Sequence, residues 1–273
     1  MLLKITHETE YTYDAPLQYA LQRLRLTPLD GPTQQVVSWQ TSIEGATRET
    51  VLDDHFGNRV ELISSQDGVG KGHVIRVVAS GEIETKDTAG VTGPHTGYVP
   101  LWLYLRATPL TEPGKGVRAL VRAAKEGETI PRLHALMDAI RSQVTYMVGT
   151  THSATTAEEA LSHGEGVCQD HSHIFISAAR MLGIPARYVS GYLLMTGEDE
   201  QATDDVQVAS HAWAEAHVED LGWIGFDVSN GHAPDERYAR LAVGLDYSDA
   251  APISGVRSGT AEESLAVSIR VEQ

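Results

Sequence analysis

The one cysteine of this 273-residue chain, Cys168, lies in the stretch GEGVCQDHSH, with glycines before it and two histidines after it. The apolar run that follows predicts a helix beginning at or just after the cysteine, which places the thiol at the positive end of the helix dipole. Such a position, with histidines nearby, can lower a cysteine pKa from about 8.5 into the range of about 3.5 to 7.5. The stretch also fits a metal ligand or a small buried residue, because free cysteines are often buried and inert.

Two predicted strands downstream carry possible partners for the thiol. In SHAWAEAHV, residues 210–218, His211 lies on one face and a row of alanines on the other, so the alanine face is expected to pack on the buried helix. In GWIGFDV, residues 222–228, Asp227 lies near the strand end. The two strands are close enough in sequence to form a hairpin.

A hairpin centred on Glu219 would pair His211 directly with Asp227, since each lies eight residues from the centre. A shift by one residue would place them on opposite faces. A carboxylate beside an imidazole fixes the ring tautomer and supports its positive charge. Cys168, His211 and Asp227 thus form a candidate nucleophile, base and orienting acid for thiol acyl transfer.

Further residues are candidates for binding the substrate or its oxyanion. The backbone N–H of Cys168 at the helix start is the first expected oxyanion donor, and the segment 146–151 is a source for a second. The side chains that we single out for the substrate groove or the oxyanion site are Tyr146, Gln169, Trp213 and Trp223. Burial alone also explains the two tryptophans.

The other histidines raise a metal-binding alternative through His163, Cys168 and His171. Only one sulfur is available, and the spacing puts only His171 on the cysteine's face of a helix, so we expect neither a metal nor any other cofactor. His173 is expected in the core, and His217 at a strand end on the surface.

The N-terminal half has the alternation of β-strands. LKITHETEYTY, residues 3–13, alternates strictly, and further strands are indicated by QQVVSWQTSIEG, by HVIRVVASGEIE and on both sides of the turn in TVLDDHFGNRVELI. Five or six strands without a helix predict an antiparallel β domain over residues 1–90. The segment 87–100 is rich in Gly, Thr and Pro, and we assign residues 91–100 as a linker.

The second half has helical spacing followed by strands. Helices are predicted at 117–127, at 130–144, after a capping box at Thr155 and Thr156, and at 170–182, where apolar residues on all sides predict a central buried helix that Gly183 and Pro185 end. Strands follow at 186–195, 210–218 and 222–228, with an acidic loop at 196–205. The predicted fold class is α+β, with a catalytic core at 101–245. An extension at 246–273 carries a final strand that belongs to either half.

Composition restricts the partners. The net charge of −16 argues against nucleic acid and anionic membranes. Neither a signal peptide nor an apolar run of membrane-spanning length is visible, and a single cysteine fits a reducing compartment, so we expect a cytoplasmic protein. The oligomeric state stays open.

These motifs, in this order, resemble the transglutaminase-like superfamily: a Gly-x-Cys helix start, a GIPAR helix stop with a GY strand, an HAW strand and a GW-to-Asp strand. The resemblance covers about residues 155–231 and implies a papain-like site with Cys168 as nucleophile, His211 as base and Asp227 as orienting acid. The N-terminal half is similar to the region that precedes this core in a bacterial subgroup often described as predicted cysteine proteases. One departure is that Val228 and Ser229 follow Asp227, where the family commonly has Pro and Thr.

The expected function is therefore thiol-dependent acyl transfer on a peptide bond or a glutamine carboxamide of a peptide or protein substrate. Water as acceptor makes the enzyme a protease or amidase, which the resembled subgroup favours, and an amine makes it a transglutaminase. The same three residues serve both reactions. A binding protein that keeps the fold without turnover is the alternative from outside the enzymes.

Overall fold

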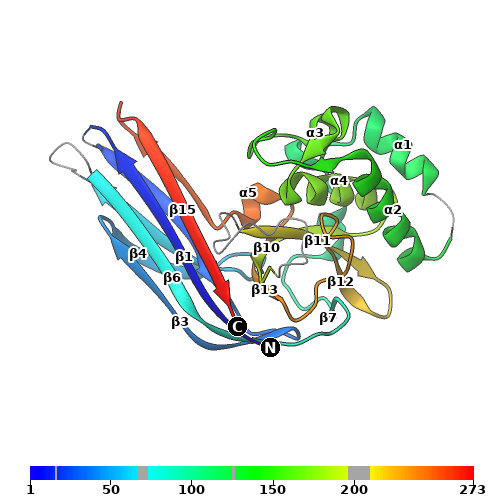
Figure 1. Cartoon of the computed structure of the whole chain (residues 1–273), viewed down its shortest axis with the longest axis horizontal. Coiled ribbons are helices and arrows are strands. Elements are labelled where there is room, and N and C mark those ends of the chain that lie inside the picture. The colour runs from blue at the N-terminus through cyan, green and yellow to red at the C-terminus, as the bar shows by residue number, and fades with distance from the viewer. Residues whose placement is uncertain (16, 67–72, 125–126, 196–209) are drawn as a thin grey trace.

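The computed structural model forms an α+β fold, as the sequence predicts, with a β-rich half beside a half that carries the helices (Figure 1). The predicted acidic loop at 196–205 lies outside the described residues. No helix in the described part of the chain combines the length and apolar character needed to span a membrane. The residues that the structure describes are 1–15, 17–66, 73–124, 127–195 and 210–273.

The β-rich half is a sandwich of two four-stranded antiparallel sheets, ordered β15-β1-β6-β3 and β14-β2-β5-β4. The alternation predicted for β1 is confirmed, because every second residue from Leu3 to Tyr13 is buried. β2 was not predicted from the sequence. The strands are β1 (Leu2–Tyr13), β2 (Tyr19–Thr27), β3 (Gln34–Glu44), β4 (Thr47–Asp53), β5 (Arg59–Gln66), β6 (His73–Thr85), β14 (Ile253–Ser258) and β15 (Glu263–Glu272).

The C-terminal segment completes this sandwich instead of forming a separate extension. β15 pairs with β1 along its length, from Lys4 opposite Glu272 to Tyr13 opposite Glu263, and β14 pairs with β2. The predicted final strand therefore belongs to the N-terminal half, and the two termini lie close together (Figure 1). The strands of the sandwich lie between residues 2 and 85 and between residues 253 and 272, which corrects the predicted domain limits.

The second half is built on a five-stranded antiparallel sheet of order β13-β10-β11-β12-β7. β7, the first of these strands in the chain, lies in the segment assigned as a linker, so that assignment is wrong for residues 91–93. β13 was not predicted. The short helix α5 (Tyr247–Ala250) also packs in this half, beyond the predicted limit at 245. The strands are β7 (Val91–Gly93), β10 (Ala186–Leu193), β11 (His211–Val218), β12 (Gly222–Phe226) and β13 (Tyr238–Gly244).

Helices cover one face of this sheet (Figure 1). Two short 3-10 helices, at Leu101–Leu105 and Pro109–Thr111, precede them, and the two-residue strands β8 (Thr145–Tyr146) and β9 (Glu165–Gly166) lie between them. The main helices are α1 (Lys115–Ala123), α2 (Thr129–Gln143), α3 (Ala157–His163) and α4 (Cys168–Met181).

The central helix α4 is buried nearly all round, as predicted. The alanine face of β11 packs in the same core cluster as Ile174 and Phe175 of α4, because small side chains let the helix lie close to the strand. The predicted capping box is present at the start of α3, where Glu159 and Thr156 hydrogen-bond reciprocally. The chain turns after α4 at Gly183, whose φ of +78° suits glycine.

Candidate active site

Cys168 is the first residue of α4 and is 9 % exposed. Its backbone N–H lies in the first helical turn, where no acceptor within the helix is available. The segment that leads to it has regular structure. Gly164 ends α3 in the left-handed conformation with φ +76°, and β9 pairs in parallel with β8.

Asp170, in the first turn of α4, fixes the start of this helix through its buried carboxylate. Its Oδ2 accepts hydrogen bonds from the backbone N–H of Val167 at 2.8 Å and from Thr151 Oγ1 at 2.7 Å. A Cβ on Gly166 would lie 2.8 Å from the Asp170 side chain, so glycine is required there. These contacts hold the backbone on both sides of Cys168 in one conformation.

His211 opens β11, and Asp227 follows the last residue of β12. The strands form the predicted hairpin, but the register is centred on Asp220, because Val218 pairs with Gly222 and Ala214 with Phe226. The predicted direct pairing of His211 with Asp227 is therefore wrong by two residues. A shift of two keeps both side chains on one face, and they meet diagonally.

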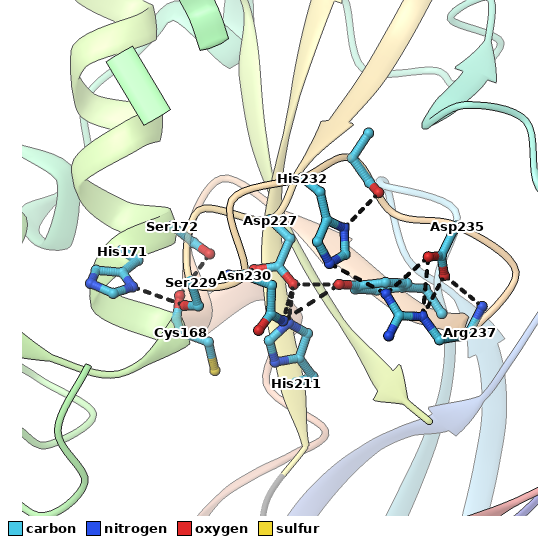
Figure 2. A network of polar contacts seen from close by, with 12 residues as sticks. Cys168, His171, Ser172, His211, Asp227, Ser229, Asn230, His232, Asp235 and Arg237 are labelled. Atoms are coloured by element: carbon cyan, nitrogen blue, oxygen red, sulfur yellow. Dashed lines mark hydrogen bonds and ion pairs between the residues drawn. The ribbon is translucent and has the colours of Figure 1, made fainter. Parts of the chain in front are cut away.

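The carboxylate of Asp227 gathers three hydrogen bonds on one oxygen (Figure 2). Its Oδ2 lies 2.6 Å from His211 Nε2, 2.6 Å from the Tyr238 hydroxyl and 2.7 Å from Asn230 Nδ2. Because Nε2 is engaged by the carboxylate, the second ring nitrogen, Nδ1, is the one turned toward the sulfur of Cys168, as Figure 2 shows.

The two buried groups shift each other's protonation. Burial alone would lower the pKa of His211, but the charge and hydrogen bond of Asp227, with a further contribution from Cys168, raise it to about 10. Burial alone would raise the pKa of Asp227, and the neighbouring His211 holds it well below its usual range instead. At neutral pH the two form an imidazolium and a carboxylate.

This pair predicts a pH dependence of stability. The His211 pKa of about 10 in the folded protein exceeds the ordinary 6.5, so its contribution is fully present below about pH 6.5 and is lost as the pH rises toward 10. We expect the free energy of unfolding to fall by a few kcal/mol over this window, and by less in His211→Gln. Urea unfolding at several pH values measures both, and parallel curves for the two proteins would contradict the expectation.

The four predicted groove or oxyanion residues divide into two pairs. Tyr146 and Gln169 are partly exposed beside Cys168. The charges of Cys168 and Asp227 add to burial in raising the pKa of Tyr146, and Gln169 Nε2 donates to the carbonyl of Ser153 at 3.3 Å. Both side chains are therefore partly accessible next to the thiol.

The tryptophans are interior residues, which corrects their assignment to a substrate groove. Trp223 is 1 % exposed and packs edge-on against Tyr104, and the guanidinium of Arg187 lies 3.9 Å from its ring centroid. Trp213 is 3 % exposed and stacks on the His211 ring with centroids 6.3 Å apart. Trp213 therefore contacts the site through the imidazole ring of His211.

Among the residues that the structure describes, no group of histidine, cysteine and carboxylate side chains forms a metal site at the thiol. His171 donates from Nε2 to the carbonyl of Val144 at 3.0 Å, and its Nδ1 lies 2.9 Å from Ser229 Oγ, so both ring nitrogens are occupied. His163 is exposed at the end of α3. His173 is fully buried in the core, as predicted, where its Nε2 accepts from the backbone N–H of Tyr247.

The turn after Asp227 is well formed despite its departure from the family pattern. Val228 is buried in the same core cluster as α4, and Ser229 binds His171. The backbone N–H groups of Gly231 and Asn230 donate to the Asp227 carbonyl at 2.8 Å and to its Oδ1 at 3.2 Å. Val228 and Ser229 therefore anchor the turn through packing and through the hydrogen bond to His171.

Sequence reasoning missed Tyr238 and Asn230, the other two donors to Asp227. Asn230 had a local signal, because an Asn three residues after an Asp fits a side-chain-capped turn. Tyr238 had only the weak β signal of YARLAVG, which did not reveal that β13 returns to the site. Tyr188 and Tyr247 were missed as well, and burial together with Cys168 raises the pKa of each.

Comparison with known proteins agrees with this architecture. The family model of the transglutaminase-like superfamily matches residues 117–228, which include Cys168, His211 and Asp227. The model of the bacterial transglutaminase-like N-terminal region matches residues 3–84. The chain therefore combines a transglutaminase-like core with the bacterial transglutaminase-like N-terminal region.

Relatives match nearly the whole length of the chain. An uncharacterised protein of Mycobacterium leprae is 29 % identical over 283 residues, covering 98 % of both chains. An uncharacterised protein of Mycobacterium tuberculosis is 29 % identical over 288 residues, covering 96 % of this chain and 89 % of its own. The crystal structure of a candidate cysteine protease from Cytophaga hutchinsonii matches with a TM-score of 0.73 at 20 % identity, covering 100 % of this chain and 92 % of its own. That likeness shows that the fold is shared.

Proposed function

We propose that the protein is a cysteine-dependent acyl-transfer enzyme that cleaves peptide or glutamine-type amide bonds, with Cys168 as nucleophile, His211 as acid and base, and Asp227 as orienting acid. One observation carries the proposal. The ring of His211 is bound through Nε2 to a fully buried carboxylate at 2.6 Å, which turns Nδ1 toward the only thiol of the chain at the start of a buried helix.

In the proposed first step, the imidazolium of His211 stabilises the thiolate of Cys168. The raised pKa of His211 favours this ion pair, and the helix N-terminus supports the negative sulfur. The thiolate attacks the amide carbonyl, a sulfur–carbon bond forms, and the carbonyl electrons move to oxygen. Asp227 stays ionised throughout and holds the ring.

Two donors are proposed for the resulting oxyanion. The first is the backbone N–H of Cys168, which has no acceptor in its own helix. The second is the hydroxyl of Tyr146, which keeps its proton because burial and the charges of Cys168 and Asp227 raise its pKa. A neutral phenol donates a hydrogen bond to developing negative charge without adding charge of its own.

The intermediate then collapses to a thioester. The carbon–nitrogen bond breaks, and the leaving amine or ammonia takes the proton from His211 Nδ1. The imidazole, now neutral, takes a proton from the incoming acceptor, and the thioester bond to Cys168 breaks. Water as acceptor gives a carboxylic acid, whereas a primary amine gives a new amide.

We propose water as the main acceptor and a peptide or protein as the substrate. The description of the Cytophaga hutchinsonii protein as a candidate cysteine protease favours hydrolysis over transfer. A net charge of −16 is compatible with basic peptides as substrates.

The test is a product analysis by mass spectrometry. The protein is incubated with a library of peptides that contain Gln and Lys, with and without an added primary amine. Hydrolysis yields cleaved peptides or Gln converted to Glu in both mixtures. Transfer yields Gln–Lys cross-linked peptides in both mixtures and, where the primary amine is added, Gln linked to that amine.

Cys168→Ala is the control, because it removes the nucleophile and leaves the fold and the surrounding charges in place. Product from wild type and none from this variant supports the proposal. Equal product from both would contradict it. Absence of product and of thioester in wild type would favour a binding protein on this fold.

A further inference from the structure

Two side-chain amides of the β sandwich pair with the outer edge of β13, the terminal strand of the core sheet. Gln34 Nε2 donates to the carbonyl of Arg240 at 2.9 Å, and its Oε1 accepts from the N–H of Arg240 at 2.7 Å. Asn58 makes the same pair of bonds to Val243, at 2.7 and 2.8 Å. A terminal strand otherwise leaves such groups unpaired, so the amides replace a neighbouring strand.

The turn of DDHFGNRV holds Asn58 in this position. Asp54 Oδ1 accepts from the backbone N–H groups of Phe56 and Asn58, both at 2.9 Å, and its Oδ2 accepts from Asn58 Nδ2 at 3.0 Å. Gly57 has a φ of +85°, which favours glycine. The asparagine side chain therefore leaves the turn in one direction.

The same turn packs against the aromatic residues behind the site. Phe56 belongs to a buried cluster with Trp213 and Tyr238. Trp213 stacks on His211, and its ring meets that of Tyr238 edge-on with centroids 5.5 Å apart. Close packing leaves these rings little freedom to shift independently.

β13 links the amides to Asp227. The strand begins at Tyr238, two residues before Arg240, and the Tyr238 hydroxyl donates to Asp227 Oδ2, the oxygen that also binds His211. A hydrogen bond to a carboxylate is strong and directional, so the start of β13 determines where that oxygen lies.

We propose that Gln34 and the turn 54–58 are positioning elements for Asp227, through which the β sandwich clamps β13 and keeps the Tyr238 hydroxyl on the carboxylate. The inference rests on the proposed catalytic role of Asp227. In this arrangement the N-terminal region sets the geometry of the core's active site as well as covering its sheet edge.

The direct measurement is the rate at which the proton on His211 Nε2 exchanges with water. NMR of the imidazole ring monitors this exchange. This proton lies in the 2.6 Å contact with Asp227 and exchanges only when the pair opens. A residue that serves only to hold the two halves together would change the melting temperature without changing this local opening.

Gln34→Met keeps the side-chain volume and removes both bonds to Arg240. We expect it to speed exchange of the His211 proton about tenfold, the effect of losing roughly one hydrogen bond. Tyr238→Phe should do the same or more. The double variant should exchange no faster than Tyr238→Phe alone, because Gln34 acts through Tyr238.

Ser65→Ala is the matched control. It removes partly buried hydrogen bonds to the Gly45 carbonyl and to His73 within the sandwich, without touching β13. We expect wild-type exchange despite a similar loss of stability. The clamp is overturned if the His211 proton exchanges at the same rate in Gln34→Met as in Ser65→Ala. It is also overturned if the effects of Gln34→Met and Tyr238→Phe on this rate add up in the double variant. Should Gln34→Met not fold, Asn58→Ala decides on the same criterion.

The two proposals fail in different ways. If the clamp variants speed exchange but Cys168 of the wild type alkylates like an ordinary thiol, the positioning stands and the acyl-transfer proposal fails. If wild-type Cys168 is activated and exchange is unchanged in the variants, the clamp fails and the acyl-transfer proposal stands.

Discussion

Replacing His211 with alanine should move the pH midpoint of Cys168 alkylation by iodoacetamide upward, because the imidazolium that favours the thiolate is lost. In the intact site the imidazolium favours the thiolate, because Asp227 and Cys168 raise the pKa of His211 to about 10 against the opposing effect of burial. The midpoint is a better measure than the rate at one pH, since a more basic thiolate is also intrinsically more nucleophilic.

His217→Ala serves as the matched control for this experiment. His217 lies on the same strand and the same face as His211, and its ring packs on Trp223 instead of Asp227. We expect the control to alkylate like wild type. A wild-type midpoint near 8.5 that His211→Ala leaves in place would refute the activated thiol.

The second large effect is expected for Asp227→Asn, with a loss of about 10³- to 10⁴-fold in the rate of Cys168 acylation. The carboxylate is fully buried, and three donors converge on its Oδ2. An amide of the same shape removes the negative charge that raises the pKa of His211, and its NH₂ group can turn the imidazole to the wrong tautomer.

Labelling of Cys168 by a peptide-derived electrophile measures this loss. Asp235→Asn is the control. Asp235 lies in the chain between Asp227 and β13, and its carboxylate forms a partly exposed ion pair with Arg237. The control should label like wild type. An Asp227→Asn rate within a few-fold of wild type, in a folded protein, is incompatible with an orienting acid at this position.

The parts of the site that the sequence predicts are those that depend on local pattern. The start of α4 at Cys168 follows from the apolar run and the glycines, and the common face of His211 and Asp227 follows from period-two alternation in a hairpin. The register itself was predicted wrongly, because the turn is centred on Asp220, which adopts φ +68° ahead of Gly222 at +84°. The common face survives this error because the shift is two residues.

The parts that the sequence does not predict depend on pairing between distant segments. Tyr238 reaches Asp227 only because β13 pairs with β10, across an irregularity in register after Ser190. β15 pairs with β1 from the other end of the chain, which no local pattern indicates. A tryptophan such as Trp223 fits either a substrate groove or a core, because its ring is apolar and carries one N–H group. The packing of Tyr104 and Arg187 around Trp223 shows that it is interior.

The central claim is a covalent acyl group on Cys168, and the most direct measurement is the intact mass of the protein quenched in acid during turnover of the peptide library. We predict a mass increase equal to one acyl fragment, mapped to Cys168 in wild type and absent in Cys168→Ala. An unmodified wild-type mass while product accumulates, or an acyl group on another residue, would contradict the account.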